Sequence, residues 1–314
     1  MAFDVLLMST ICGRVYFFLL QEPATTETFS GRFPRGFCDV SARFRWGSGK
    51  VSARFQHGFG EVLARLRCSH GEPIFQFNLN INSDNNSRNF ITKSDRGIDV
   101  GLIFNKDVFK VKNSNSHDVF ITGNNSSKRR NTRDQLVVSG LLDGELIHII
   151  VNHWPSRGAD ETKRIAAAEV NNSIIDSLRN IHNNPKIITM GDFNDDPFDK
   201  SIKKVLGAKK EIKEVGKNDL YNPFEKILVE KGIGTNAYRD KWQLFDQIIL
   251  SKEFLKKDYK DYQLYKAGVF NKSFLINKKG KFKGYPYRSF SYGTFTGGYS
   301  DHLPPYIFLL KEIK

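Results

Sequence analysis

Residues 187–196 read Ile-Ile-Thr-Met-Gly-Asp-Phe-Asn-Asp-Asp, and the interpretation of the whole chain starts from this stretch. Its apolar first half is typical of a short buried strand. Its second half places Asp192 and Asn194 directly after that strand. A carboxylate and a carboxamide at the tip of a strand suit a site that holds a metal ion or a polarised phosphate. Because Gly, Asp and Asn also form ordinary turns, their meaning depends on the rest of the chain.

Other polar residues end or interrupt apolar runs in the same way. They are Asn152-His153-Trp154, Asp246 within the run 242–250, and Ser300-Asp301-His302. Hydrolysis of a phosphodiester requires a divalent metal to neutralise the phosphate, a group that orients water, and stabilisation of the leaving oxygen. Mg²⁺ prefers oxygen ligands and retains several waters. The residue types at these strand ends match that chemistry.

Each of these residues has a candidate role. We expect Asp192 to orient the attacking water and Asn194 to donate an amide hydrogen bond to a phosphate oxygen; for both, the alternative is an ordinary turn residue. We expect His302 to contact the scissile phosphate as a cation. A buried carboxylate raises the pKa of a histidine, and Asp246 is the natural partner. Asp301 is a candidate metal ligand.

A second group of residues is expected to contact the substrate. His153 is expected to bind phosphate beside His302, with a core histidine as the alternative. Arg157 follows the His153 strand, and a guanidinium there suits bidentate binding of a phosphate. Arg96 is a similar candidate, or a loop arginine paired with Asp95 or Asp99. The ring of Trp154 suits stacking on a base or sugar, although tryptophan in a core is the commoner arrangement.

Apolar periodicity from residue 73 onward predicts an alternation of strands with one long helix. The helix is expected over 160–181, opened by acidic residues that favour the positive end of the helix dipole. A short helix is expected over 201–206. The polar segments 113–133 and 278–293 are expected to be mobile loops. The expected strands cover residues 98–104, 135–141, 146–152, 186–190, 244–250 and 305–310.

Composition restricts the class of partner. The net charge of +14 and a pI of about 9.5 favour a polyanionic partner such as nucleic acid, although a solvated lysine-rich surface gives the same numbers. No apolar run reaches the roughly 18–20 residues of a membrane helix, and the apolar stretch near the N-terminus lacks the features of a signal peptide. Three cysteines show no metal spacing and do not support a disulfide framework. We expect a monomer; the compartment is not indicated.

The composition changes near residue 70. Residues 1–70 contain no asparagine, one lysine (Lys50), eight arginines and all three cysteines, whereas asparagine and lysine are abundant afterwards. We therefore divide the chain into an atypical segment 1–72 and a domain 73–314. The segment 1–72 is interpreted as non-native to this fold, for instance through a frame error or gene fusion. The alternatives are a separate basic module and a divergent first strand pair.

Four groups of residues, taken in chain order, resemble the motifs of the endonuclease/exonuclease/phosphatase superfamily. They are His153, Gly191-Asp192-Phe193-Asn194, the strand residues Trp242 to Ile248 around Asp246, and Ser300-Asp301-His302. The strings 96–100, 152–157 and 297–302 look like a bacterial branch of it. The resemblance covers roughly residues 75–312. It implies an α+β fold, a four-layer α/β/β/α sandwich of the deoxyribonuclease I type, and phosphoester hydrolysis dependent on Mg²⁺ or Mn²⁺. By motif position it also implies the roles given above for Asp192, Asn194, Asp246, His302, His153 and Asp301.

The chain departs from the family pattern at its beginning. The family carries an asparagine at the end of its first strand and a metal-binding glutamate in a Leu-Gln-Glu string at the end of its second. Leu20-Gln21-Glu22 imitates that string, so Glu22 is a candidate metal ligand, but it lies too near the N-terminus to follow a strand and a helix. We therefore expect the first strands of one sheet to be missing or replaced.

Three functions follow from these observations. The first is a metal-dependent phosphodiesterase or endonuclease acting on nucleic acid, favoured by the ordered motifs and the basic loops. The second is a phosphatase or a sphingomyelinase-like lipid phosphodiesterase with the same chemistry. The third is a catalytically impaired binding protein, because the early asparagine and glutamate are not found.

Overall fold

The computed structural model describes the backbone of residues 3–11, 14–23, 40–46, 49–58, 61–68, 73–80, 100–104, 108–123, 126–292 and 294–312. Side chains are described for residues 100–102, 104, 108–121, 132–289, 291–292 and 294–312. The chain divides into two compact units, Met1–Gln21 with Phe90–Lys314, and Glu22–Asn89. The predicted boundary between residues 72 and 73 falls inside the second unit, and this division of the chain stays a prediction.

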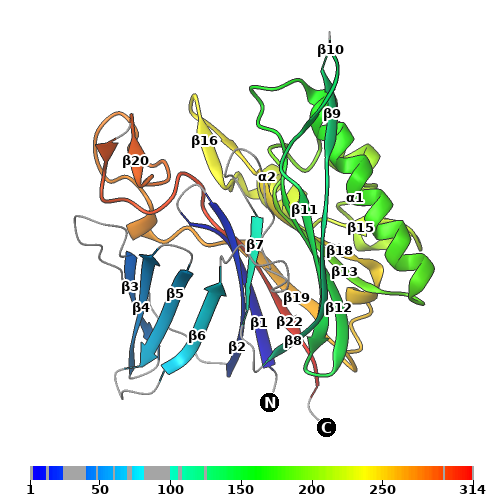
Figure 1. The fold of residues 1–314 in the computed structure, drawn as a ribbon, viewed down its shortest axis with the longest axis horizontal. Helices are drawn as coiled ribbons and strands as arrows, with labels where there is room; N and C mark the ends of the chain where they lie inside the picture. The colour runs from blue at the N-terminus through cyan, green and yellow to red at the C-terminus, as the bar shows by residue number, and fades with distance from the viewer. Residues whose placement is uncertain are drawn as a thin grey trace. The chain divides into compact units, whose positions relative to one another are not determined.

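The first unit is built around two sheets (Figure 1). The larger sheet has the strand order β14-β15-β18-β13-β12-β11-β8. Its strands are β8 (Phe109–His117), β11 (Gln135–Leu142), β12 (Glu145–His153), β13 (Lys186–Asp192), β14 (Ala208–Lys209), β15 (Leu220–Tyr221) and β18 (Asp246–Ser251). The smaller sheet has the order β19-β22-β1-β2-β7, from β1 (Phe3–Ile11), β2 (Arg14–Pro23), β7 (Val100–Phe104), β19 (Gln263–Val269) and β22 (Pro305–Leu310).

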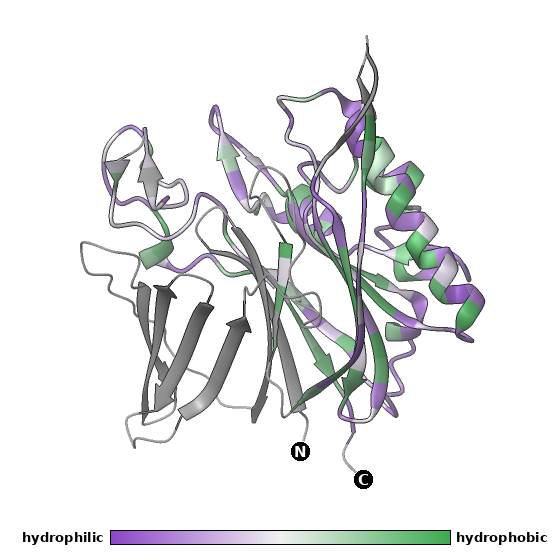
Figure 2. Cartoon of the chain, viewed as in Figure 1, coloured by the Kyte–Doolittle hydropathy of each residue, from purple (hydrophilic) through white to green (hydrophobic). Residues whose placement is uncertain are grey.

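The core lies between these two sheets. Val100 and Leu102 of β7 and Ile307 and Leu309 of β22 pack with one face of β11, β12, β13 and β18. Figure 2 shows β7 and β12 as mostly apolar, whereas the loops at the upper edge are mostly polar. Burial of apolar surface is the main driving force for this packing. The predicted sandwich of two sheets is therefore confirmed.

Helix α1 (Glu161–Ile181) covers the other face of the larger sheet (Figure 1). Ala167, Ala168, Ile174 and Ile175 pack with apolar side chains of β12, β13 and β18. The side chain of Asp160 accepts a hydrogen bond from Thr162 N, so it satisfies one of the free amides at the helix N-terminus. Helix α1 and the two sheets form three of the four predicted layers; a second outer helical layer does not appear among the described residues.

The remaining elements of this unit are short. They are helix α2 (Phe224–Lys231), the π-helical turn η1 (Ser201–Val205), the 3₁₀ turns η2 (Ile212–Glu214), η3 (Lys252–Phe254) and η4 (Ser273–Leu275), and the hairpins β9 (Phe120–Gly123) with β10 (Ser126–Asn131), β16 (Asn236–Tyr238) with β17 (Lys241–Gln243), and β20 (Phe290–Ser291) with β21 (Thr294–Phe295). The expected mobile loop 113–133 is wrong, because β8 pairs with β11 along its length and β9 pairs with β10.

Strands β1 and β2 belong to the smaller sheet. β1 pairs antiparallel with β22, and β2 pairs parallel with β7. The sequence predicted that the first strands of one sheet are missing or replaced, whereas the backbone of residues 3–11 and 14–23 forms two strands of this sheet. Whether that segment is native to the fold stays a prediction. The second unit contains an antiparallel sheet of β3 (Val40–Trp46), β4 (Gly49–Gly58), β5 (Glu61–Cys68) and β6 (Pro73–Asn80).

Candidate active site

Three strands of the larger sheet deliver polar residues to one edge. β12 and β13 are parallel, and their last paired residues are His153 and Asp192. β18 runs antiparallel to β13, and its first residue, Asp246, is paired with Asp192. The end of β12, the end of β13 and the start of β18 therefore coincide. The predicted convergence of these separate chain segments is present in the fold.

Gly191 permits the close approach of β12 to β13. Its φ of +138° is rarely adopted by residues with side chains, and a Cβ at this position would lie 2.0 Å from the carbonyl oxygen of Asn152. The glycine before Asp192 is therefore required by the packing of two backbones. Asn194 has a φ of +51°, and its N–H donates to Oδ1 of Asp192 over 2.9 Å. The tip of the strand is a tight turn stabilised by the aspartate itself.

His302 approaches the same edge from the segment before β22. Its Nδ1 lies 2.7 Å from Oδ2 of Asp246, which is fully buried. Ligand atoms of Asp192, Asp246 and His302 all lie within 4.8 Å of one another. Two carboxylates and an imidazole from three distant parts of the chain thus form one cluster.

Thr235 positions both halves of the His302–Asp246 pair. This buried residue accepts hydrogen bonds at Oγ1 from the backbone N–H groups of Phe245 (3.1 Å) and Asp246 (3.2 Å). Its carbonyl oxygen accepts a hydrogen bond from Leu303 N over 2.7 Å. One threonine therefore connects the start of β18 to the residue that follows His302. Sequence reasoning missed Thr235, because nothing around it marks it as more than part of a loop.

The cluster strongly perturbs the pKa values of its members. Burial by itself lowers the pKa of His302, but the charge and hydrogen bond of Asp246 outweigh it and raise the pKa to about 10. Burial and the neighbouring charge of Asp246 raise the pKa of Asp192 above its usual value. His302 is therefore a cation at neutral pH, and Asp192 binds a proton more readily than an exposed aspartate.

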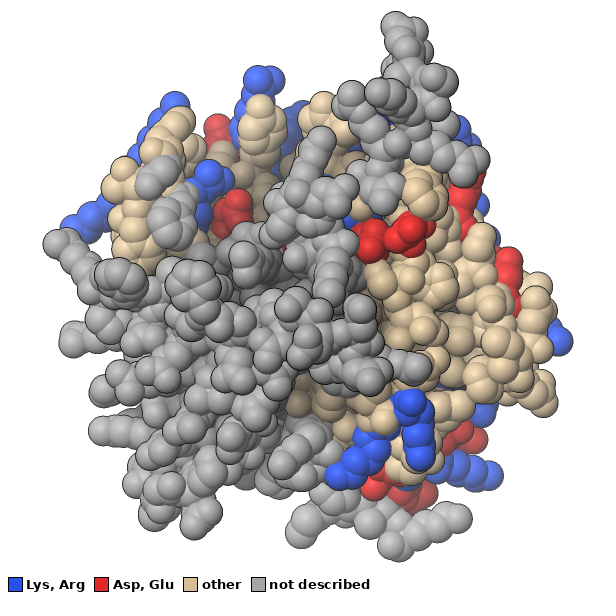
Figure 3. Space-filling model, viewed as in Figure 1, with Lys and Arg blue, Asp and Glu red and all other residues tan. Residues whose placement is uncertain are grey.

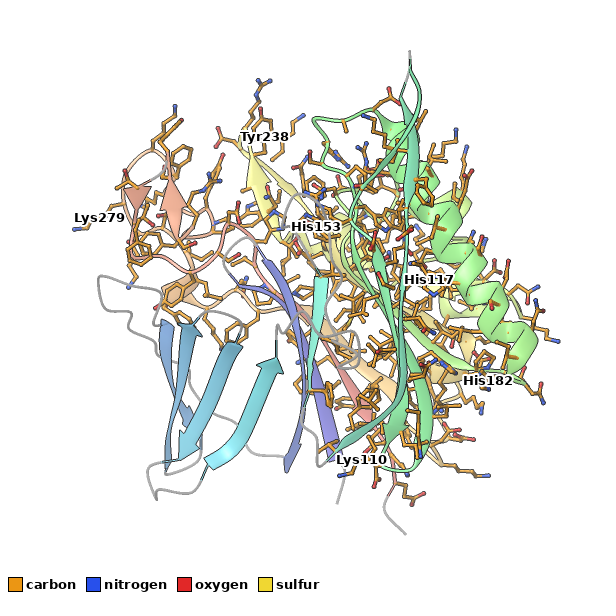
Figure 4. All side chains as sticks on the ribbon, viewed as in Figure 1. Lys110, His117, His153, His182, Tyr238 and Lys279 are labelled. Atoms are coloured by element: carbon orange, nitrogen blue, oxygen red, sulfur yellow. The ribbon has the colours of Figure 1, made fainter. Side chains whose placement is uncertain are left out.

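His153 lies beside this cluster but has the opposite electrostatic character. Its Nε2 is 3.6 Å from Oδ2 of Asp192. Burial, followed by the positive charges of Arg133 and His302, lowers the pKa of His153 to about 3. Nδ1 of His153 is buried and has no hydrogen-bond partner among the described residues. His153 is thus a neutral imidazole, available as a hydrogen-bonding group rather than as a charge. Figure 4 shows it at the upper part of the sheet, far from His182 at the end of α1.

Arg133 is a further basic residue of this region that sequence reasoning placed in a mobile loop. Its Nη1 donates to the carbonyl oxygen of Trp154 over 3.3 Å, and its charge affects both His153 and Asp192. Arg133 precedes β11, whose beginning pairs with the end of β12. The antiparallel pairing of those two strands is the signal that would have placed it here.

Arg157 stabilises the loop that follows Asp192. Its guanidinium donates to the carboxylates of Asp196 and Asp199 and to the carbonyl oxygen of Asn194, and it lies 4.7 Å from the ring centre of Phe245. Binding of a phosphate by this side chain, as the sequence predicted, requires competition with these carboxylates. Asn194 donates one amide hydrogen to the carbonyl oxygen of Trp154 over 2.9 Å and retains a second.

The other expected site residues lie elsewhere. Trp154 is 1% exposed and packs edge-on against Phe193, with ring centres 4.7 Å apart, so a base cannot stack on its ring. The expected stacking role of Trp154 is therefore corrected to a core role. Asp301 is exposed and is not part of the cluster of Asp192, Asp246 and His302. The side chains of Glu22 and Arg96 lie outside the described residues.

The donor set fits a divalent metal ion. Asp192 and Asp246 supply carboxylate oxygens of the kind that Mg²⁺ and Mn²⁺ accept, and these oxygens lie within 4.8 Å of each other. His302 is protonated and bonded to Asp246, so it contributes a positive charge beside the ion and not a ligand atom. An α+β sandwich with carboxylates and histidines at one edge of its larger sheet is an arrangement that metal-dependent phosphoesterases use. The chain belongs to the endonuclease/exonuclease/phosphatase family, whose family model matches residues 83–311.

The solved structures that match this chain are distant from it in sequence. An endonuclease/exonuclease/phosphatase family protein from Bacteroides thetaiotaomicron is 17% identical, with a TM-score of 0.41, over 67% of this chain and 68% of that one. A mannosyl-6-phosphatase from the same organism is 17% identical, with a TM-score of 0.40, over 66% and 68%. A humanized D. rerio TDP2 is 14% identical, with a TM-score of 0.39, over 65% and 68%. No curated protein matches the chain by sequence.

Proposed function

We propose that this chain is a divalent-metal-dependent phosphodiesterase that cleaves nucleic acid. The observation that supports it best is the hydrogen bond between His302 and the buried Asp246, with Asp192 within 4.8 Å of both. The charge of Asp246 raises the pKa of His302 and so favours the protonated imidazole. A phosphodiester carries a negative charge that repels an attacking hydroxide, so a fixed cation beside a carboxylate is the arrangement that its hydrolysis needs. A bound divalent ion supplies further neutralisation of that charge.

Each residue of the cluster has a different role in the proposed hydrolysis. Asp192 accepts a hydrogen bond from the attacking water and orients it, and its raised pKa suits a group that takes up a proton. His302 donates a charged hydrogen bond to a phosphate oxygen. The free amide hydrogen of Asn194 and the neutral ring of His153 donate to the other oxygens. Asp246 acts through His302, because its charge keeps the imidazole protonated.

Charge favours nucleic acid over a small neutral substrate. The net charge of the chain is +14, and lysines and arginines stand out over β16 and β20 at the upper edge of the molecule in Figure 3. A polyanionic backbone releases counterions when it binds such a surface, which strengthens association. None of the helices that the structure describes is long and apolar enough to cross a membrane.

The direct test is hydrolysis of four substrates by the purified chain with Mg²⁺ or Mn²⁺. We expect cleavage of plasmid DNA and of bis-p-nitrophenyl phosphate, abolished by a chelator and strongly reduced by Asp192→Asn. Preferential hydrolysis of a phosphomonoester or of sphingomyelin would contradict a nuclease. No hydrolysis of any substrate, together with no calorimetric Mg²⁺ binding, would instead favour the impaired binding protein.

A further inference from the structure

The segment 270–300 contains six basic residues and no acidic residue, and it leads directly into Asp301-His302. We call it the basic lobe. All six basic side chains are exposed: Lys272, Lys278, Lys279, Lys281, Lys283 and Arg288. Since no carboxylate in the lobe offsets these charges, the lobe presents an excess of positive charge to solvent. Figure 4 shows Lys279 at its outer edge.

Internal contacts hold the lobe in shape. The side-chain amide of Asn277 donates to the carbonyl oxygen of Pro286 over 2.9 Å, and Tyr287 Oη donates to the carbonyl oxygen of Thr296 over 2.5 Å. Phe274 packs edge-on against Tyr299, with ring centres 5.5 Å apart. The backbone that holds the exposed residues of the lobe is therefore fixed by internal contacts. This reduces the conformational entropy that is lost when those residues bind a partner.

Aromatic rings project from the same surface. Tyr292 is fully exposed, and Phe282 is 47% exposed. The neighbouring hairpin β16–β17 adds Tyr238, which is 59% exposed and lies 5.2 Å from the guanidinium of Arg239. Exposed large rings next to cations are costly to hydrate and suit a partner with flat π-faces and negative charges.

A hydrogen bond joins the hairpin to the lobe. Tyr285 Oη donates to Oδ1 of Asp240 over 2.6 Å, and it also accepts a hydrogen bond from Asp240 N over 2.7 Å. The hairpin precedes Asp246 by a few residues, and the lobe precedes His302 by two. The two members of the His302–Asp246 pair are therefore each continuous in the chain with one half of this aromatic and basic surface.

We propose that the basic lobe and the β16–β17 hairpin bind an unpaired nucleic acid strand next to the candidate active site; this inference rests on the proposed function. The lysines contact phosphates, and the rings of Tyr238 and Tyr292 stack on bases. Stacking needs unpaired bases, because a duplex buries their faces.

The test is binding without turnover. The affinities of the full chain for a fluorescent single-stranded oligonucleotide and for its duplex are measured by anisotropy in a chelator. We expect the single strand to bind more tightly, and Tyr238→Ala and Tyr292→Ala each to weaken its binding about 5- to 100-fold. Both variants are expected to hydrolyse bis-p-nitrophenyl phosphate like the wild type, because this small diester does not reach the surface.

Tyr265→Ala is the matched control, because Tyr265 is 62% exposed but lies on β19, outside the lobe. It should leave strand binding unchanged, whereas Lys278→Gln should lower the salt dependence of binding. Equal binding of strand and duplex, or an equal loss in the Tyr265 variant, would overturn the inference. Binding to phosphatidylserine vesicles is measured in parallel. If Tyr238→Ala and Tyr292→Ala weaken vesicle binding but leave strand binding unchanged, the surface binds lipid and the inference is overturned. This binding test is independent of the test of the proposed function, because a failure of the proposed function appears as an absence of metal-dependent DNA cleavage.

Discussion

The hydrogen bond between His302 and Asp246 sets the charge of the candidate site. Asp246 is fully buried and raises the pKa of His302 to about 10, so the imidazole keeps its proton through the physiological range. His153, on the neighbouring strand end, has its pKa lowered to about 3 by burial and nearby positive charges. Two histidines of the same site thus carry different charges at pH 7, because only one of them has a buried carboxylate as its hydrogen-bond partner.

We predict that His302→Gln lowers the rate of metal-dependent phosphodiester hydrolysis by about 10²- to 10⁴-fold, since glutamine can donate a hydrogen bond but carries no charge. The measurement is kcat on bis-p-nitrophenyl phosphate. His182→Gln, at the C-terminal end of α1, is the control and should leave kcat within twofold. Wild-type activity in the His302 variant would remove this residue from the mechanism.

Individual residues were predictable from the sequence where a strand end dictated their place. Asp192, Asp246 and His302 follow or precede apolar runs, and the sheet brings them together. Trp154 and Arg157 were harder to interpret, because each follows the same strand yet serves the structure. Trp154 donates to Asn152 Oδ1 in the core, and Arg157 binds the acidic loop. Sequence spacing does not reveal which partner saturates a polar side chain.

At the scale of elements, apolar periodicity predicted the strands of the core closely. β22 has the predicted bounds, and α1 begins after the predicted Asp160. The prediction failed for β8, because this edge strand is mostly polar and only its start is buried. An edge strand is paired on one side only, and polar residues there discourage pairing with another chain. The amino-acid composition of β8 therefore resembles that of a loop, although its backbone is extended and paired with β11.

Gly191→Ala should disrupt the contact of β12 with β13. A Cβ there lies 2.0 Å from a backbone oxygen, and φ is +138°. We predict a loss of about 3 kcal/mol or more in the free energy of unfolding, measured with urea. Gly144→Ala is the control: φ is +85°, but nothing lies within 4 Å of the new Cβ. It should cost only about 1 kcal/mol. Equal losses would show that the close approach is not rigid.

Asp160→Ala should weaken the start of α1. The lost hydrogen bond to Thr162 N leaves a helix amide unsatisfied, so the free energy of unfolding should fall measurably. Asp176→Ala on the same helix removes only a surface pair with Arg179 and should cost less than about 0.5 kcal/mol. Urea unfolding followed by circular dichroism compares the two, and a reversed order would reject the capping role.

At the scale of the whole unit, the end of the sheet opposite the candidate site has its own titrating group. A pocket of about 760 Å³ at the start of β13 includes His148, His182 and Lys186 in its wall. Nδ1 of His148 lies 2.7 Å from Ser139 Oγ, and its ring centre is 4.7 Å from that of His182. Burial, assisted by the charge of His182, lowers the pKa of His148 to about 4.

The lowered pKa predicts a loss of stability in acid. The neutral ring is favoured in the folded state, so the contribution is complete above pH 6.5 and declines as the pH falls towards 4. Between pH 7.5 and 5 the free energy of unfolding should fall by roughly 2 kcal/mol from this group. His148→Gln keeps a polar partner for Ser139 and should reduce that decline in urea titrations. An unchanged pH dependence would show that His148 does not titrate on unfolding.

The pairing of Asp192 with Asp246 across β13 and β18 has a consequence for how this gene tolerates insertions. Side chains alternate between the two faces of a strand, so one added codon within β13 turns Asp192 away from its neighbours. An extra residue in the β9–β10 connection moves nothing in that ladder. Natural length variation is thus expected to accumulate far from the ladder, while the seven codons of β13 stay fixed in number.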